Sequence, residues 1–254
     1  MSDKVIGLIC AIPQERVDLK AALDHEETVV LGGLDFDRGR LDGHAVVLAE
    51  AGIGKVNTAV VTTLLASRFG ADRLAFSGVA GGIDPSLAIG DLVIAERAIQ
   101  HDCGVIEGDD RLEPYQAGHV PFFNPTEQLG YDVAPALLAR IKAALGDMEF
   151  PPLAAEAGGS GENARIAYGT ILAGDQYIHS EMTRERLHRT FEAKAVAMEG
   201  GAMAQVAARF GLPWLEIRAL SDLAGTSSRF DFARFVDDVA KRSATVLRRI
   251  LPVL

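Results

Sequence analysis

The feature that most constrains this fold is a regular alternation of short apolar runs with segments of helical periodicity. Apolar runs of strand type cover residues 5–12, 45–54, 73–82, 90–99, 166–175 and 212–221. Segments whose apolar residues recur at helical spacing cover 14–23, 55–70, 134–145, 200–211 and 230–251. Such alternation is typical of a largely parallel sheet with helices on both faces. The sequence therefore predicts an α/β fold of three layers, α/β/α, around a central mixed, largely parallel twisted sheet.

Length and composition favour a single domain. The chain has 254 residues, of which 48% are hydrophobic, and this is enough to bury one sizeable core. Because there is no internal repeat and no sign of a second domain, we expect residues 1–254 to form one domain. Two segments fall outside the alternation. Residues 101–131 are rich in loop formers and aromatic side chains, and residues 151–165 are expected to form a flexible loop.

Charge and cysteine content argue against several classes of protein. The net charge is −10 and no dense Lys/Arg block occurs, so no nucleic-acid partner is expected. The two cysteines, Cys10 and Cys103, give no disulfide framework, and Cys10 is expected to be an inert core thiol. The histidines have no metal-ligand spacing, so we expect no metal and no cofactor. Without a membrane-spanning run or a signal-peptide cleavage site, we expect no membrane partner and a cytoplasmic location.

Acidic residues follow several of the predicted strands. Glu15 comes after the first strand, Glu199 lies in "AMEGG", and Asp222 ends the last strand. Because α/β folds bind ligands at the carboxyl ends of their strands, we expect these acids to share a ligand site. The glycine turn "SGVAGG" would let a ligand approach the backbone. Each acid taken alone also suits a structural role, as a helix-dipole partner, a helix-start residue or a turn residue.

Other catalytic motifs are absent or weak. The sequence has no nucleophile elbow, no Walker loop and no dinucleotide-binding glycine motif. His101 and Asp102 are adjacent and suit a catalytic pair, but a structural pair is the favoured interpretation. The acids at the strand ends are therefore the leading candidates for catalysis.

Taken together, these stretches resemble the nucleoside phosphorylase/nucleosidase superfamily, and within it the bacterial 5′-methylthioadenosine/S-adenosylhomocysteine nucleosidases. The resemblance covers most of the chain outside residues 101–165, through the co-linear motifs "IGLICAIPQERV", "EAGIGKVNTAVVTTLL", "FSGVAGGIDPSLAIGDLVIAERAIQHD", "GTILAGDQYI" and "AVAMEGGAMAQVAARFGLPWLEIRALSDLAG". It implies hydrolysis of the N-glycosidic bond of 5′-methylthioadenosine and/or S-adenosylhomocysteine. It also implies a purine nucleoside as substrate, a role in methionine salvage and a homodimer.

The resemblance further implies a role for each matching residue. Asp222 is the acid that protonates or hydrogen-bonds purine N7, and Glu15 is the base that activates water. Glu199 binds the ribose hydroxyls, a task that suits a two-oxygen acceptor. The other matching positions are expected to contact the base, the sugar or the 5′-substituent, or to orient the catalytic groups: Val79, Ala80, Gly81, Tyr177, Ile178, Met198, Arg218, Ser221 and Phe232.

The sequence departs from the nucleosidase pattern at three of these places. Ala197 stands where the family often has a further acid, and Val79 stands where a small hydroxyl residue often helps to hold the water. Tyr177 stands where phenylalanine is familiar.

Three alternatives remain open. Phosphorolysis needs fixed positive charge, but the similar phosphorylases have arginine and serine at the positions of Phe76 and Val79 here. Arg16 is the remaining candidate for phosphate and is more simply an exposed helix residue. The second alternative is a hydrolase for futalosine or another 6-oxopurine nucleoside. The third is a catalytically silent ligand-binding relative, which the presence of Glu15, Glu199 and Asp222 together disfavours.

Overall fold

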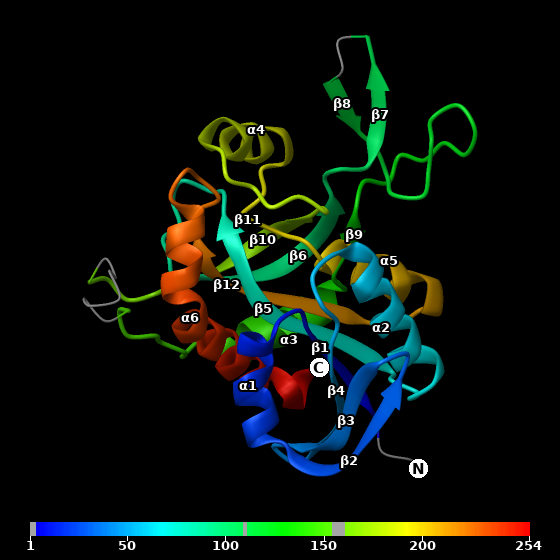
Figure 1. The fold of residues 1–254 in the computed structure, drawn as a ribbon, viewed down its shortest axis with the longest axis vertical. Helices are drawn as coiled ribbons and strands as arrows, with labels where there is room; N and C mark the ends of the chain where they lie inside the picture. The colour runs from blue at the N-terminus through cyan, green and yellow to red at the C-terminus, as the bar shows by residue number, and fades with distance from the viewer. Residues whose placement is uncertain (1–3, 109–110, 154–160) are drawn as a thin grey trace.

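The fold is a twisted central sheet with helices packed against both faces (Figure 1). The computed structural model describes residues 4–108, 111–153 and 161–254. Its strands are β1 (Ile6–Cys10), β2 (Asp24–Leu31), β3 (Leu34–Leu41), β4 (His44–Glu50), β5 (Arg73–Gly82), β6 (Leu92–Gln100), β7 (Gly104–Glu107), β8 (Arg111–Pro114), β9 (Tyr131–Asp132), β10 (Ile166–Ala173), β11 (Ala195–Ala197) and β12 (Trp214–Asp222). Its helices are α1 (Pro13–Ala22), α2 (Lys55–Ser67), α3 (Pro135–Leu145), α4 (Glu181–Phe191), α5 (Gly200–Phe210), α6 (Ser228–Ile250) and the short 3₁₀ helix η2 (Leu251–Val253).

The main sheet is mixed, and its strands from β11 to β4 pair mostly in parallel, as predicted. Its strand order is β11-β10-β6-β12-β5-β1-β4-β3-β2. Strand β1 pairs in parallel with β4 and β5, and β5 pairs in parallel with β12, whereas β12 and β6 run antiparallel. A further antiparallel pairing joins β11 to the end of β5, with Val196 opposite Gly81. This pairing brings the segment that follows β11 beside the glycine turn.

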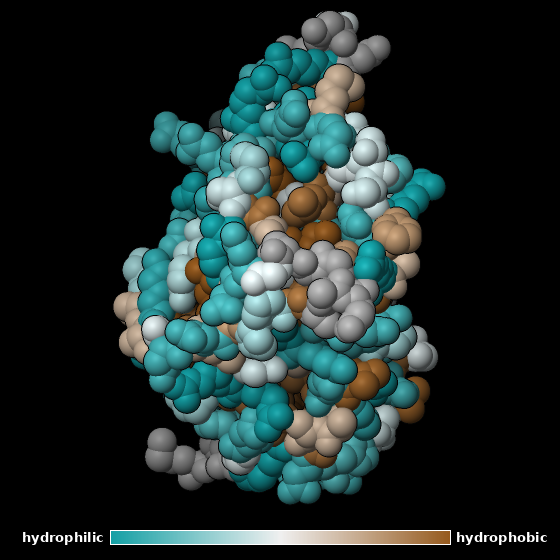
Figure 2. All heavy atoms as spheres, turned by 90° about the vertical axis from the view of Figure 1, so that its left-hand side faces the viewer, coloured by the Kyte–Doolittle hydropathy of each residue, from teal (hydrophilic) through white to brown (hydrophobic). Residues whose placement is uncertain are grey.

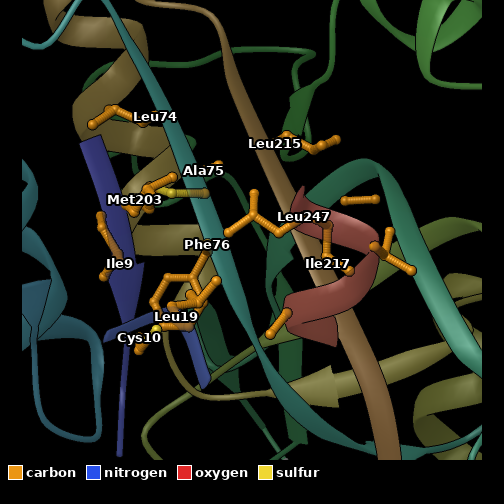
Figure 3. Packing of buried hydrophobic residues seen from close by; sticks show 14 of the residues in the cluster. Ile9, Cys10, Leu19, Leu74, Ala75, Phe76, Met203, Leu215, Ile217 and Leu247 are labelled. Carbon is orange, nitrogen blue, oxygen red and sulfur yellow. The ribbon is translucent and has the colours of Figure 1, made fainter. Parts of the chain in front are cut away.

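The helices form the two outer layers and enclose an apolar core. Helices α1, α3 and α6 lie on one side of the sheet, and α2 and α5 lie on the other (Figure 1). The buried side chains Cys10 of β1, Leu19 of α1 and Phe76 of β5 lie together in this core (Figure 3). Burial raises the pKa of the Cys10 thiol well above its usual value, which confirms the expected core thiol. The predicted three-layer architecture is confirmed.

The sequence pattern does not predict the antiparallel hairpin of β2 and β3. Strand β2 is largely exposed and begins with several acidic residues, and its apolar run, Val29–Leu31, is only three residues long. The hairpin is attached to α1 through Asp37 of β3, a fully buried carboxylate that pairs with Arg16 and Lys20. These contacts hold the pKa of Asp37 down, at about 2. Charged contacts with α1 thus accompany the apolar packing of this hairpin.

Two helices leave some of their valine side chains exposed. In α2, Val56 and Val60 are 74% and 47% exposed, and Val61 is buried instead. In α1, Val17 is 59% exposed while Leu19 is buried. The start of α2 therefore has an apolar strip that this single chain does not cover.

The segments outside the alternation contain little regular structure. Strands β7 and β8 form a short hairpin that projects from the main body (Figure 1). In the loop that follows, Phe122 and Phe123 are 88% and 80% exposed. The flexible loop expected at 151–165 falls largely on residues 154–160, which lie outside the described residues.

The face drawn in Figure 2 is mainly hydrophilic, and hydrophobic side chains show chiefly in its hollows. Within the described ranges, no helix is both long and apolar enough to cross a membrane.

Candidate active site

A cleft of about 290 Å³ opens where the central strands end. Its lining contains the residues that the sequence placed there, except Ile178, which lines an adjoining recess of about 40 Å³. Tyr177, Met198 and Asp222 line both cavities, so Ile178 lies beside the same site. The lining also includes residues that were not predicted to belong to it: Ala11, Ile12, Ile53, Val196 and Ala197.

Glu15 is buried in the first turn of α1, where backbone amides hold both of its oxygens. Its Oε2 accepts hydrogen bonds from the amides of Ala11 and Ile12, at 2.6 and 3.3 Å. Its Oε1 accepts one of 2.8 Å from the amide of Val79 in β5. Burial raises the pKa of Glu15 to about 7, although these amides and Arg218 act in the opposite direction. The group is thus a fixed carboxylate that changes protonation near neutral pH.

Arg218 is a buried cation that connects the walls of the cleft. Its Nη2 donates to Oε2 of Glu199 at 3.1 Å, and its Nη1 donates to the Val79 carbonyl at 3.0 Å. The same Nη1 lies 3.9 Å from Oε1 of Glu15. The guanidinium also lies 4.1 Å from the ring centre of Phe76, a cation–π contact. These contacts together hold the guanidinium between Val79, Glu199 and Phe76.

Glu216 is a buried carboxylate in this cluster that sequence reasoning missed. Its Oε1 accepts a hydrogen bond of 2.7 Å from Nε of Arg218. Residues two apart in a strand point to the same face, so Glu216 accompanies Arg218 into the cluster. The sequence does contain a hint of this contact. Glu216 and Arg218 are opposite charges two residues apart within the apolar run "WLEIRAL", and buried charges are usually paired.

Glu199 stands at the start of α5 and faces the cleft. Its Oε1 accepts from the amide of Gly54 at 3.1 Å, and its Oε2 accepts from the amide of Met198 at 3.1 Å as well as from Arg218. The pairing of β11 with β5 places this segment beside Gly81. The carboxylate therefore ties its own segment to two others, at Gly54 and Arg218.

Asp222 ends β12 at the other side of the cleft. Its Oδ1 accepts a hydrogen bond of 2.8 Å from the amide of Ala224, and its Oδ2 accepts one of 3.0 Å from the Ser221 hydroxyl. The residue is 3% exposed, and burial raises the pKa of its carboxyl. Asp222 is thus both the predicted turn residue and a buried acid at the cleft.

Apolar and aromatic side chains complete the lining. Tyr177 follows β10 and is 47% exposed, and Met198 precedes the helix start. Phe232 of α6 lines the cleft, as predicted, and Phe235 of the same helix is buried in the core. Ala80 and Gly81 of β5 form the floor with backbone close to the cavity. A flat apolar ligand with a few polar groups suits such a site.

His101 and Asp102 lie outside the cleft lining and have structural contacts. Asp102 pairs with Nζ of Lys55 at 2.6 Å and accepts from the Asp175 amide at 2.9 Å. His101 is buried against Gly174. The structure therefore favours the structural interpretation of this pair. Within the described residues, no group of three or more His, Cys, Asp or Glu side chains is arranged to hold a metal ion.

Known proteins resemble this chain along nearly its whole length. The family model described as the phosphorylase superfamily matches residues 5–252. The 5′-methylthioadenosine/S-adenosylhomocysteine nucleosidase of Mycobacterium bovis is 56% identical over 249 residues, covering 98% of this chain and 97% of that protein. A ligand-bound structure of the Helicobacter pylori nucleosidase of the same name has a TM-score of 0.83 at 28% identity, covering 100% of both chains. A futalosine hydrolase structure from Helicobacter pylori has a TM-score of 0.82 at 28% identity, covering 99% of this chain and 98% of that chain.

Proposed function

We propose a hydrolytic function for this chain from the premise that it belongs to the phosphorylase superfamily and, within it, to the 5′-methylthioadenosine/S-adenosylhomocysteine nucleosidases. The reaction is hydrolysis of the N-glycosidic bond of 5′-methylthioadenosine and/or S-adenosylhomocysteine, which releases adenine and the 5′-thio-substituted ribose. The observation that best supports it is that two buried carboxyl groups, Glu15 and Asp222, line one cleft.

In this proposal the two carboxyl groups have complementary roles. Asp222 transfers a proton to N7 of adenine as the bond between C1′ and N9 breaks. A water molecule forms the new C1′–O bond and gives a proton to Glu15. The raised pKa of Asp222 favours the protonated acid, and the pKa of Glu15 of about 7 suits a base at neutral pH. A pKa of about 7 leaves about half of Glu15 ionised at neutral pH, and the upward shift at Asp222 acts in the direction that its acid role needs.

The remaining lining residues are proposed to bind the parts of the nucleoside. Glu199 accepts hydrogen bonds from the ribose hydroxyls, and Met198 packs against the sugar. Tyr177 stacks on adenine, and the backbone of Ile178 contacts the base edge from the adjoining recess. Phe232 lines the pocket for the 5′-substituent. Ser221 orients Asp222 through their hydrogen bond.

Val79 acts through its backbone amide and carbonyl groups, so an apolar side chain at this position is compatible with the proposed hydrolysis. Its amide binds Oε1 of Glu15, and its carbonyl accepts from Arg218. The position thus helps to fix the base without a hydroxyl group. In this proposal, Glu15 and the neighbouring polar groups position the water.

The charge of the cleft argues against phosphorolysis. Among the described residues that line it, Arg218 is the only lysine or arginine, and its N–H groups already bind Glu216, Glu199 and the Val79 carbonyl. Arg16 pairs with Asp37 of the hairpin and does not line the cleft. A phosphate ion would therefore meet carboxylates without a free cation to bind it.

The direct test is adenine release from 5′-methylthioadenosine by the purified chain, with and without inorganic phosphate. We expect equal rates in both and a free thio-sugar as product. Futalosine is the competing substrate to include, because a futalosine hydrolase has a similar fold. Strict dependence on phosphate, or a preference for futalosine, would contradict the proposed reaction. Failure to cleave any purine nucleoside would favour a silent binding protein.

We also propose that the chain forms a homodimer through the uncovered strip of α2. Val56, Val60 and the preceding Ile53 are exposed apolar side chains on one short segment. Contiguous exposed apolar side chains are typical of protein–protein interfaces. The cytoplasmic location and the role in methionine salvage stay predictions from the sequence and the resemblance.

A further inference from the structure

A carboxylate that the proposed mechanism does not use lies beside the cleft cation. Glu216 of β12 is fully buried and is bound through its Oε1 to Nε of Arg218. Its Oε2 is also buried and has no hydrogen-bond partner within the described part of the chain. A buried oxygen of this kind is unfavourable for folding. Its position next to the proposed catalytic groups therefore calls for a role in the site.

The backbone makes room for this carboxylate at a single glycine. A Cβ added at Gly200, the first residue of α5, would lie 1.9 Å from Oε2 of Glu216 and 2.1 Å from its Cδ. No real side-chain carbon lies so close to another heavy atom without displacing it. Glu216 therefore requires glycine at the very start of the helix that Glu199 precedes.

Glu216 and Glu199 accept hydrogen bonds from different nitrogen atoms of the same guanidinium. Glu216 accepts from Nε of Arg218 at 2.7 Å, and Glu199 accepts from Nη2 at 3.1 Å. The remaining Nη1 faces the Val79 carbonyl and, at 3.9 Å, Oε1 of Glu15. Because one positive charge is shared among these carboxylates, a change at Glu216 alters how strongly the cation attracts Glu15.

We propose that Glu216 is a positioning residue of this site and acts through Arg218. It holds the guanidinium in the orientation that binds Glu199, and its negative charge offsets the cation so that Glu15 stays basic enough to take a proton from water. This inference rests on the proposed function, in which Glu15 is the base.

The charged and titratable groups around Glu15 come from every element packed against it. Arg218 of β12 and Glu199 before α5 act on Glu15 directly, and Glu216 of β12 acts through Arg218. Cys10 of β1, Glu50 of β4 and Arg16 of α1 belong to the same cluster around Cys10. Among them, Arg218 lowers the pKa of Glu15 and Glu199 raises it. Burial keeps the Cys10 thiol neutral, and Arg16 is paired with Asp37. Removing the charge of Glu216 should therefore strengthen the effect of Arg218 and lower the pKa of Glu15.

The test compares the pH dependence of kcat/KM for the wild type, Glu216→Gln and Glu216→Met. Glutamine keeps an oxygen that accepts from Arg218 but removes the charge, whereas methionine has a similar volume and no acceptor. For the glutamine variant we expect the acid limb to move down by about one pH unit. Its plateau should stay within about threefold of the wild type, because a weaker base is only moderately slower. For the methionine variant we expect kcat/KM to fall at least about tenfold as Arg218 loses its anchor.

An acid limb at the same pH in the wild type and Glu216→Gln would overturn the electrostatic part of the proposal. Equal plateaus in the glutamine and methionine variants would overturn the positioning part. If the methionine variant does not fold, as judged by circular dichroism, the profile of the glutamine variant still decides the first question. A wild type that releases no adenine would instead contradict the proposed function, so the two failures are distinguishable.

Discussion

Glu15 and Asp222 are both carboxyl groups, and their surroundings suit them to opposite roles. Three amides and a nearby cation favour the charged form of Glu15, so its pKa rises only to about 7 despite burial. Asp222 receives one amide and one hydroxyl hydrogen bond, and burial raises its pKa. At the scale of the residue, the hydrogen bonds around each carboxyl group therefore support the division into base and acid.

The pKa of Glu15 predicts the acid limb of the pH profile. Glu15 must be ionised to accept a proton, so kcat/KM should fall about tenfold per pH unit below its pKa of about 7. Asp222 must be protonated, so kcat/KM should also fall where this carboxyl ionises, and burial moves that fall to higher pH. Adenine release measured between pH 5 and pH 9 checks both limbs. An acid limb near the ordinary glutamate value of about 4.3 would contradict this assignment.

Most of the candidate site could be predicted from the ends of the strands, but the buried carboxylate Glu216 could not. Glu15, Glu199 and Asp222 each follow an apolar run, and parallel strands bring such ends to one edge. Glu216 lies inside a strand, where sequence alone does not say which face meets another element. Only the packing of α5 against β12, at Gly200, reveals that this face holds a charge cluster.

At the scale of the element, the start of α5 should be sensitive to any added side chain. Gly200→Ala would place a carbon 1.9 Å from Oε2 of Glu216, so β12 or α5 must shift. We expect a loss of about 1–3 kcal/mol in unfolding free energy, the usual cost of overpacking a rigid site. Chemical denaturation measures this loss, and the double variant Gly200→Ala with Glu216→Val should recover part of it.

Gly146→Ala is the matched control for that experiment. Gly146 ends α3 with φ −61°, and an added Cβ would meet no atom closer than 3.5 Å. Stability should therefore stay equal or rise by up to about 1 kcal/mol. If the Gly200 variant is as stable as this control, the two elements are not packed as described.

Helix boundaries were easier to predict than helix faces. The apolar spacing in α2 correctly indicates a helix, but Val56 and Val60 are exposed and Thr58 is buried. A threonine can be buried in a helix because its hydroxyl binds a carbonyl one turn earlier, as Thr58 does with Gly54 at 3.0 Å. Apolar residues that face a partner chain and those that face the core give the same periodicity.

At the scale of the whole molecule, that exposed strip predicts self-association. Val56→Asp introduces a charge on α2 that would be buried in the proposed dimer, so we expect a shift towards monomer in sedimentation velocity. Val30→Asp is the control, because Val30 is 63% exposed on the edge strand β2 and away from the strip. A wild type that sediments as a monomer, or equal effects of both variants, would contradict the proposed interface.

The most direct test of the acid–base pair uses two substrates that differ only in their leaving group. One is 5′-methylthioadenosine, whose adenine must be protonated to depart, and the other carries p-nitrophenolate, which departs without a proton. We predict that Asp222→Asn loses about 10²–10⁴-fold in kcat with the first substrate and little with the second. Glu15→Gln should lose activity with both, since each reaction needs an activated water. Equal losses for Asp222→Asn with the two substrates, or near wild-type cleavage of methylthioadenosine, would contradict the account.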